Sequence, residues 1–213
     1  MTSSIVSTSV RDFTAALASD APAPGGGSAA AAAGAMGAGL LAMVVRLTLG
    51  REKYRASWEE LEPLMDRLEN ARIHLLQLVD EDTKAFDAVV AARRLPKETD
   101  ADKAAREKAI GEANVLATTV PMQTAFFAHE TLKNAPAVFE KGNPNAASDA
   151  WAGALASWAA VLAALANVRI NLPGLADPEL QLGFREDADA MEQSAGEALE
   201  KARALARTRG LAA

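Results

Sequence analysis

Asp82 is the residue whose position most needs a chemical explanation. It interrupts a run of apolar residues spaced alternately three and four apart, as on one face of a long helix predicted for residues 60–94. The run consists of Leu61, Leu64, Leu68, Ala71, Leu75, Leu78, Asp82, Ala85 and Val89. A carboxylate among leucines costs free energy unless it is paired or used. The pattern predicts either a functional carboxylate, or a buried ion pair or a hydrogen bond between helices.

A second carboxylate, Asp149, stands between a polar segment and a strongly apolar one. It follows Asn143, Asn145 and Ser148, and it falls in the first turn of a helix predicted from about 146 to 171. The helix dipole stabilises a carboxylate there, so capping is one explanation. The same group of polar side chains at the mouth of a buried helix also describes the rim of a ligand site.

Two asparagines, Asn167 and Asn171, lie four residues apart at the far end of the same helix. They are expected to cap the helix or to form hydrogen bonds between helices. Three cations are placed to bind an anionic substrate tail: Arg51 and Lys53 follow an alanine-rich helix, and Lys97 follows a proline in a loop. Each is otherwise an ordinary surface residue.

A glycine-rich turn, Pro24-Gly25-Gly26-Gly27-Ser28, precedes a segment of alanine and glycine. Such a turn lets the backbone approach a ligand closely, with the free N–H groups of a helix start nearby. Ser28 is expected to be the N-cap of a helix that ends at about Leu49, with Gly50 as its C-terminal cap. A flexible turn before a tightly packed helix is the alternative. No strand precedes the glycines and no Gly-Lys-Ser/Thr follows, which argues against dinucleotide and P-loop sites.

Composition excludes several classes of function. The 213 residues carry a net charge of −6 without a basic block, which argues against binding to nucleic acid. Cysteine is absent, so disulfides and thiolate nucleophiles are excluded. The two histidines, His74 and His129, have no partner at helical spacing, so a transition-metal site is not expected and no role is assigned to either. A hard cation bound by carboxylates is not excluded, although nothing indicates one.

The periodicity predicts one all-α domain, residues 1–213, built as a bundle of about six helices with no strand. The expected helices cover residues 10–18, 28–49, 60–94, 100–139, 146–171 and 178–209. Pro63 is expected in the first turn of its helix, and Pro121 and Pro136 are expected to break or kink theirs. Asp177 is the expected N-cap of the last helix.

Two stretches without charge, residues 21–45 and 150–168, are long enough to cross a membrane. The first contains prolines and many glycines, and the second is mostly alanine. Both compositions favour helices buried within a bundle or an oligomer. The apolar N-terminal stretch has no flanking basic run, so no signal peptide is predicted and a cytoplasmic location is expected.

Several segments, in this order, resemble the cyclodeaminase/cyclohydrolase family of folate enzymes. The family includes the C-terminal domain of formiminotransferase-cyclodeaminase and free-standing methenyltetrahydrofolate cyclohydrolases. The matching segments are APGGGSAA (23–30), LTLGREKY (47–54), DTKAFDAV (82–89), LPKET (95–99), VP (120–121), GNPN (142–145) with SD (148–149), and NV (167–168) with Asn171. Each is short, but the ordered set covers nearly the whole chain.

The resemblance implies an all-α bundle that forms a homodimer through helices rich in small residues. It places a folate site in a cleft at or near the subunit interface. No cofactor and no metal are implied, and neither a nucleic-acid nor a membrane partner. The chain is too short to add a formiminotransferase domain, which favours a free-standing cyclohydrolase that hydrolyses 5,10-methenyltetrahydrofolate to 10-formyltetrahydrofolate. A cyclodeaminase that releases ammonia from 5-formiminotetrahydrofolate is the first alternative, and a non-catalytic folate-binding or interaction module is the second.

The resemblance also assigns roles to residues. Asp149 is expected to transfer a proton or stabilise a cation, and Asp82 is the second catalytic candidate, orienting water or holding Lys97. The turn from Pro24 to Ser28, with Gly25, Gly26 and Gly27, is expected against the ligand. Hydrogen bonds to the pterin are expected from Asn143, Ser148 and Asn171. The glutamate tail is expected on Arg51, Lys53 and Lys97.

Overall fold

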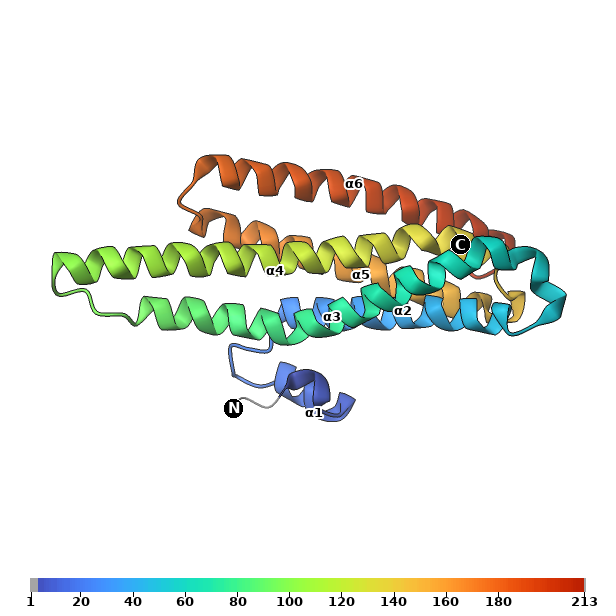
Figure 1. Ribbon diagram of the computed structural model, residues 1–213, viewed down its shortest axis with the longest axis horizontal. Coiled ribbons are helices and arrows are strands. Elements are labelled where there is room, and N and C mark those ends of the chain that lie inside the picture. Colours follow the sequence, from blue (N-terminus) through green and yellow to red (C-terminus); the bar gives the residue numbers. More distant parts are fainter. Residues whose placement is uncertain (1–3, 213) are drawn as a thin grey trace.

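The computed structural model describes residues 4–212, and they fold into an elongated bundle of helices without a strand (Figure 1). The α-helices are α1 (Val10–Leu17), α2 (Gly26–Leu49), α3 (Trp58–Arg93), α4 (Asp100–Lys141), α5 (Ala147–Asn171) and α6 (Pro178–Thr208). A short 3-10 turn, η1 (Ile5–Ser7), precedes α1, and three others lie between helices: η2 (Glu52–Ser57), η3 (Pro144–Ala146) and η4 (Leu172–Gly174). The expected all-α class and the number of helices are confirmed.

Helix α2 forms the centre of the bundle because its small residues allow neighbouring helices to approach closely. It packs against α3, α4 and α5. At the crossing with α5, a Cβ atom added to Gly37 would lie 2.9 Å from the carbonyl oxygen of Gly153. No side chain fits there, so glycine at this position determines the distance between the two helices.

By length and hydropathy alone, the segments Gly26–Leu49 and Pro144–Gly174 could each cross a membrane. In the fold, the first is α2 and the second contains α5, which packs against α2, α4 and α6. Residues such as Leu41, Val45 and Leu165 on these helices are fully buried in the same hydrophobic core. Core helices of a bundle have this combination of apolar composition and burial.

The apolar stripe of α3 faces the core as predicted. Its leucines and alanines are buried, whereas Val89 is half-buried. The N-cap at Asp177 is also confirmed, since its carboxylate accepts hydrogen bonds from the backbone N–H groups of Glu179 and Leu180. Ser28 is not an N-cap: α2 begins two residues earlier, at Gly26, and Gly25 occupies the cap position.

Pro63, Pro121 and Pro136 all lie inside continuous helices, so the expected break at Pro121 or Pro136 does not occur and Pro63 is not in a first turn. α4 runs through Pro121 and Pro136, and α3 begins at Trp58, which places Pro63 in its second turn. A proline at 121 leaves the carbonyl of Ala117 without its helical N–H partner. Asn171, at the end of α5, donates its side-chain amide to that carbonyl at 2.7 Å. A tertiary hydrogen bond thus replaces the missing helical one.

The N-terminal segment lies against one side of the bundle, where α1 stands apart from the other helices (Figure 1). None of the residues of α1 is buried. The carboxylate of Asp80 on α3 holds the start of this segment through the hydroxyl of Ser4 and the backbone N–H groups of Ile5 and Val6. The chain then returns through Pro22 to the start of α2.

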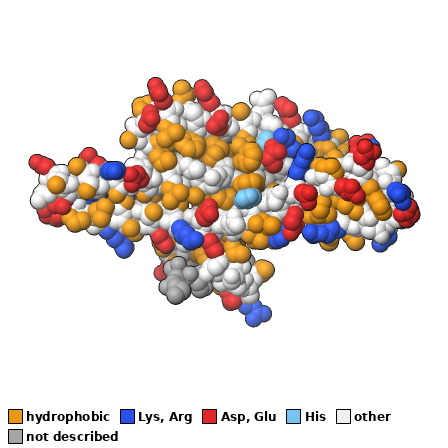
Figure 2. Space-filling view, in the orientation of Figure 1, with side chains coloured by type: hydrophobic (Ala, Val, Ile, Leu, Met, Phe, Trp, Pro, Cys, Tyr) orange, Lys and Arg blue, Asp and Glu red, His pale blue; other side chains and the backbone are white. Residues whose placement is uncertain are grey.

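Both histidines find partners from other helices rather than from their own. His129 Nε2 lies 2.9 Å from Ser194 Oγ on α6, and His74 stacks on Phe127 with ring centroids 4.6 Å apart. Figure 2 shows apolar side chains gathered over the middle of the face in view, with charged groups along its upper and lower edges and at both ends.

Candidate active site

A cleft of about 620 Å³ opens where four helices converge. It is lined by the start of α2, the C-terminal third of α3, part of α4 and the C-terminal end of α5. We call it the glycine cleft because Gly25, Gly26 and Gly27 form part of its wall, together with Asp82. Two expected features of the sequence, the glycine turn and the carboxylate on the apolar stripe, are therefore brought together.

Asp82 is half-buried, and its Oδ2 atom accepts a hydrogen bond of 2.9 Å from the hydroxyl of Ser28. Burial raises the pKa of the Asp82 carboxyl above its ordinary value, and the hydrogen bonds from the side chain and backbone of Ser28 oppose that rise. Within residues 4–212 no salt bridge involves Asp82. The expected hydrogen bond between helices is present, and the carboxyl also faces an open cleft.

Gly27 makes room for this carboxyl group. A Cβ atom added there would overlap the Asp82 side chain. Gly26 is also close to a side chain, since its added Cβ would lie 3.4 Å from Asn167 Nδ2. Ser28 is fully buried and does not line the cleft, and neither does Pro24. Part of the glycine turn therefore serves the protein's own carboxylate rather than a ligand.

Three amides, those of Asn114, Asn167 and Asn171, line the cleft. Each donates through Nδ2 to a main-chain carbonyl: Asn114 to Gly174 at 2.6 Å, Asn167 to Ala163 at 2.8 Å, and Asn171 to Ala117 at 2.7 Å. These bonds hold the amide planes in place and engage one donor of each group. A heterocycle with alternating donors and acceptors is the kind of ligand that such fixed amides recognise.

Apolar groups and one cation complete the cleft. Phe86 and Ile170 are 37% and 78% exposed, and both line it together with Val89 and Arg93. Arg93 is the only basic side chain among the lining residues. Asp82, Phe86, Val89 and Arg93 are spaced four, three and four residues apart, which places them on one face of α3.

The other predicted catalytic residue lies elsewhere. Asp149 is in the first turn of α5, whereas Asn171 is its last residue. The 22 residues between them correspond to about 33 Å of helix at 1.5 Å per residue. Within one chain, Asp149 and the glycine cleft are therefore at opposite ends of α5.

The polar segment that ends at Asp149, residues 142–149, forms what we call the asparagine loop. Asn143 is buried, and its Oδ1 atom accepts hydrogen bonds from the hydroxyl of Tyr54 at 2.8 Å and from the backbone of Asn145 at 3.1 Å. Its own N–H donates to Thr48 Oγ1 at 2.8 Å. Ser148 is exposed beside a separate hollow of about 350 Å³. Within this chain, Asn143 fastens the loop to the bundle and neither residue lines the glycine cleft.

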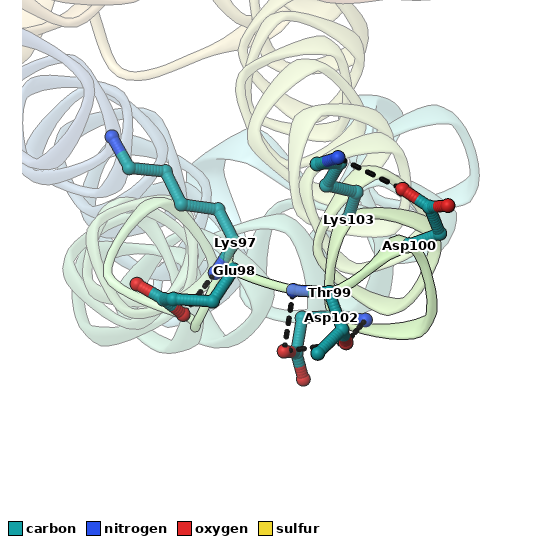
Figure 3. A network of polar contacts seen from close by, with 6 residues as sticks. All are labelled: Lys97, Glu98, Thr99, Asp100, Asp102 and Lys103. Carbon is teal, nitrogen blue, oxygen red and sulfur yellow. Dashed lines mark hydrogen bonds and ion pairs between the residues drawn. The ribbon is translucent and has the colours of Figure 1, made fainter.

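The three cations expected on the glutamate tail are also separated. Arg51 and Lys53 are exposed near η2, and Lys53 Nζ lies 4.6 Å from the ring centroid of Tyr54. Lys97 is at the opposite end, in the loop between α3 and α4, where its backbone N–H donates to Glu98 at 2.9 Å (Figure 3). Its side chain points away from the Asp100–Lys103 pair drawn there. The three do not form one binding site within a single chain.

Comparison with known proteins places the chain in a family. Residues 9–190 match the family described as formiminotransferase-cyclodeaminase, which is most of the chain. The chain belongs to this family. The resemblance inferred from the seven segments of sequence is thereby confirmed.

The individual relatives include both cyclohydrolases and cyclodeaminases. The chain is 43% identical over 168 residues to a methenyltetrahydrofolate cyclohydrolase of Methylorubrum extorquens, a match covering 79% of this chain and 81% of the relative. It is 35% identical to a formimidoyltransferase-cyclodeaminase of Sus scrofa, and the match covers 87% of this chain but 34% of that longer protein. The crystal structure of a formiminotetrahydrofolate cyclodeaminase from Thermotoga maritima superposes with a TM-score of 0.80 at 25% identity, covering 96% of this chain and 98% of that one.

Several residues of the cleft were not predicted. Arg93 and Phe86 had a signal in the sequence, because they share a helical face with Asp82. Asn114 had none, since its place in the cleft depends on how α4 packs against the end of α5. Within the described residues, no group of three His, Cys, Asp or Glu side chains could hold a metal ion.

Proposed function

We propose that this protein is a methenyltetrahydrofolate cyclohydrolase, which adds water to 5,10-methenyltetrahydrofolate and yields 10-formyltetrahydrofolate. The observation that carries the proposal is the half-buried Asp82 carboxyl in a cleft of fixed amides and apolar walls. The 43% identity to a cyclohydrolase over most of both chains supports the choice of reaction.

The chemistry needs a group that accepts and returns a proton. Water attacks the cationic methenyl carbon between N5 and N10 and loses one proton to a base, forming a tetrahedral carbon. The bond from this carbon to N5 then breaks, N5 takes up a proton, and the hydroxyl loses its own as the formyl C=O forms. One proton is released overall. Asp82 accepts the proton from water and supplies one to N5, and its ionised form attracts the cationic substrate.

The lining residues suit the two parts of such a substrate. The amides of Asn114, Asn167 and Asn171 bind the pterin edge, and Phe86 and Ile170 cover its flat faces. Arg93 binds a carboxylate of the glutamate tail. Water, a carboxylate and these groups are sufficient for the reaction, so we propose that no cofactor takes part.

We also propose a cytoplasmic homodimer formed through α2. Along α2, Met36, Met43 and Leu47 are 62%, 36% and 39% exposed, an apolar stripe beside small residues. Two copies paired antiparallel about the middle of α2 would place the end of one helix, near Arg51, beside the glycine turn of the other. In that arrangement Asp149 of one subunit acts at the cleft of its partner, and the proposed catalytic role of Asp149 is retained.

The test is an absorbance assay with two substrates. Purified protein should accelerate the loss of the methenyl chromophore of 5,10-methenyltetrahydrofolate above the spontaneous rate. The alternative activity, a cyclodeaminase, is favoured by the structural match to the Thermotoga maritima enzyme. It would instead produce that chromophore and ammonia from 5-formiminotetrahydrofolate. No acceleration of either reaction would contradict both enzymatic proposals and favour a folate-binding module.

A further inference from the structure

Ser28 occupies an unusual position behind the wall of the glycine cleft. It is fully buried, and its Oγ atom lies 2.9 Å from Asp82 Oδ2 and 3.1 Å from the backbone carbonyl oxygen of Val79. Thr83 Oγ1 is a third neighbour at 3.4 Å. A serine hydroxyl has one hydrogen and two lone pairs, so it can donate to only one of these acceptors at a time.

The two acceptors suit the two protonation states of Asp82. When Asp82 is ionised, the hydroxyl of Ser28 donates to its carboxylate. When Asp82 carries a proton, its own O–H donates to Ser28 Oγ, and the hydroxyl of Ser28 donates to the Val79 carbonyl. In both states the carboxyl group and the serine stay hydrogen-bonded, which a buried polar pair requires.

We propose that Ser28 is a positioning residue that holds the Asp82 carboxyl group in one place in both protonation states, by turning its single hydrogen from the carboxylate to the Val79 carbonyl. The role rests on the proposed function, in which Asp82 accepts a proton and returns it. A backbone N–H can only donate, so it cannot accept the O–H of a protonated Asp82, whereas the Ser28 hydroxyl can. A lysine or arginine in this place would stabilise the ionised form alone.

Most of the groups around the Asp82 carboxyl are neutral, so few other charges influence its protonation. The parts of α2, α4 and α5 that line the cleft contribute glycines, Ala117, Ile170 and the amides of Asn114, Asn167 and Asn171. On α3, Arg93 is the other charged side chain lining the cleft. Two acidic neighbours precede Asp82 in sequence: Asp80 is bonded to the N-terminal segment, and Glu81 is exposed.

The test replaces Ser28 and follows Asp82 directly. With ¹³C-labelled aspartate, the Asp82 carboxyl signal is identified by its loss in Asp82→Asn, and its titration is compared between the wild-type protein and Ser28→Ala. We expect a higher pKa of Asp82 in Ser28→Ala. Both protonation states lose a hydrogen bond to Ser28, but the bond lost by the carboxylate is charge-assisted and therefore the stronger of the two. Ser28→Cys, which keeps a weak donor of similar shape, should titrate between the two.

A matched control separates this role from loss of stability. Ser157 is another fully buried helical serine, and its hydroxyl donates to the carbonyl of Gly153 in its own helix at 2.8 Å. Ser157→Ala should leave the titration of Asp82 and the pH profile of turnover unchanged. Ser28→Ala should lower kcat by about tenfold, a part of what general acid–base catalysis contributes, and leave KM unchanged.

An unchanged Asp82 titration in Ser28→Ala would overturn the proposal. A rise in KM with unchanged kcat would also overturn it, because that result assigns Ser28 to substrate contact. The titration needs no turnover. If the wild-type protein acts on neither folate, the proposed function fails while the relation between Ser28 and Asp82 is still measured.

Discussion

The glycine cleft and the asparagine loop both contain a carboxylate and several asparagines near a helix end, but they use them differently. In the loop, Asn143 is buried and its side-chain oxygen accepts from two partners within the chain. In the cleft, Asp82 has one side-chain donor and faces an open volume of about 620 Å³. The pKa of Asp82 is raised by burial, so the cleft holds a group suited to proton transfer.

The two regions differ in the sequence signal that pointed to them. Polar residues before an apolar helix are the usual means of closing a loop, and Asn143 does this by accepting from Tyr54. A carboxylate in the middle of an apolar stripe has no such local use. The Asp82 side chain needs space on the facing helix α2, and the absence of a side chain at Gly27 provides it. Asp82, whose burial costs free energy, therefore indicated the position of the cleft, whereas the polar residues of the asparagine loop did not.

The largest effect is expected from Asp82→Asn, which keeps the shape of the side chain and removes the base. Turnover of methenyltetrahydrofolate should fall by about 10²–10⁴-fold, as for loss of a general base. Asp149→Asn is the matched variant at the asparagine loop. If it loses turnover too, mixed subunits of the two variants should regain activity, because one composite site per dimer is intact. An Asp149→Asn protein with normal turnover would assign catalysis to the glycine cleft alone.

The next largest effect is expected at Gly27, where the absence of a side chain leaves space for the Asp82 carboxyl group. Gly27→Ala should abolish turnover and destabilise the fold by about 1–3 kcal/mol, because the new Cβ overlaps the Asp82 carboxyl. Gly111→Ala is the control, since a Cβ added there meets nothing within 4 Å on helix α4. It should stabilise the fold by about 0.5–1 kcal/mol. Urea unfolding measures both, and equal stabilities for the two variants would contradict the geometry.

Asn143→Ala tests the loop as a structural region. It removes the acceptor of the Tyr54 hydroxyl and of a backbone N–H, and should cost about 1–3 kcal/mol of stability. Tyr54→Phe removes one of these bonds and should cost less. Thermal unfolding and turnover are measured together. If Asn143→Ala unfolds as the wild-type protein does, the loop is not fastened by this side chain.

A smaller effect joins the cleft to the proline in α4. Asn171→Ala removes the donor to the Ala117 carbonyl and should cost about 1 kcal/mol. With Pro121→Ala as background, residue 121 regains an N–H for that carbonyl, so Asn171→Ala should then cost less. A double-mutant cycle measures the difference. Additive effects would mean that the amide does not replace the missing helical bond.

The smallest effect is the dependence of stability on pH. The pKa of Asp82 is higher in the folded protein than in the unfolded chain, so the folded state binds more protons between these two values. Stability should therefore fall as pH rises from the ordinary aspartate range through the folded pKa of Asp82. Asp82→Asn should remove this part of the slope in urea unfolding at a series of pH values. An Asp149→Asn protein, by comparison, should keep it.

Much of the fold followed from local patterns. The period of the apolar residues predicted the helices, and Asp177 marked the start of α6. The family followed from short segments in a fixed order. One error was also local: Ser28 was assigned as the N-cap, although α2 starts at Gly26. Pro121 and Pro136 were expected to break or kink their helix, and the structure excludes the break. The helix continues because a side chain from α5 compensates Pro121.

The candidate site was predicted in part. Asp149 and Asn171 were both expected at the folate site, and within one chain 22 helical residues separate them by about 33 Å, so the role of Asp149 there stays a prediction that needs a second subunit. Arg93 could have been found from its spacing to Asp82. The pairing of Gly27 with Asp82 could not, because it depends on how closely α2 approaches α3.

By itself, the sequence determined the helices, the face of α3 that carries Asp82, and membership of the folate enzyme family. These depend on interactions between residues close along the chain, whose periods and caps are readable locally. Only the tertiary structure decided which polar groups share a cleft, that Ser28 faces Asp82, and that Asn143 fastens a loop. Those relations join residues far apart in the chain, and the packing distances between helices set them.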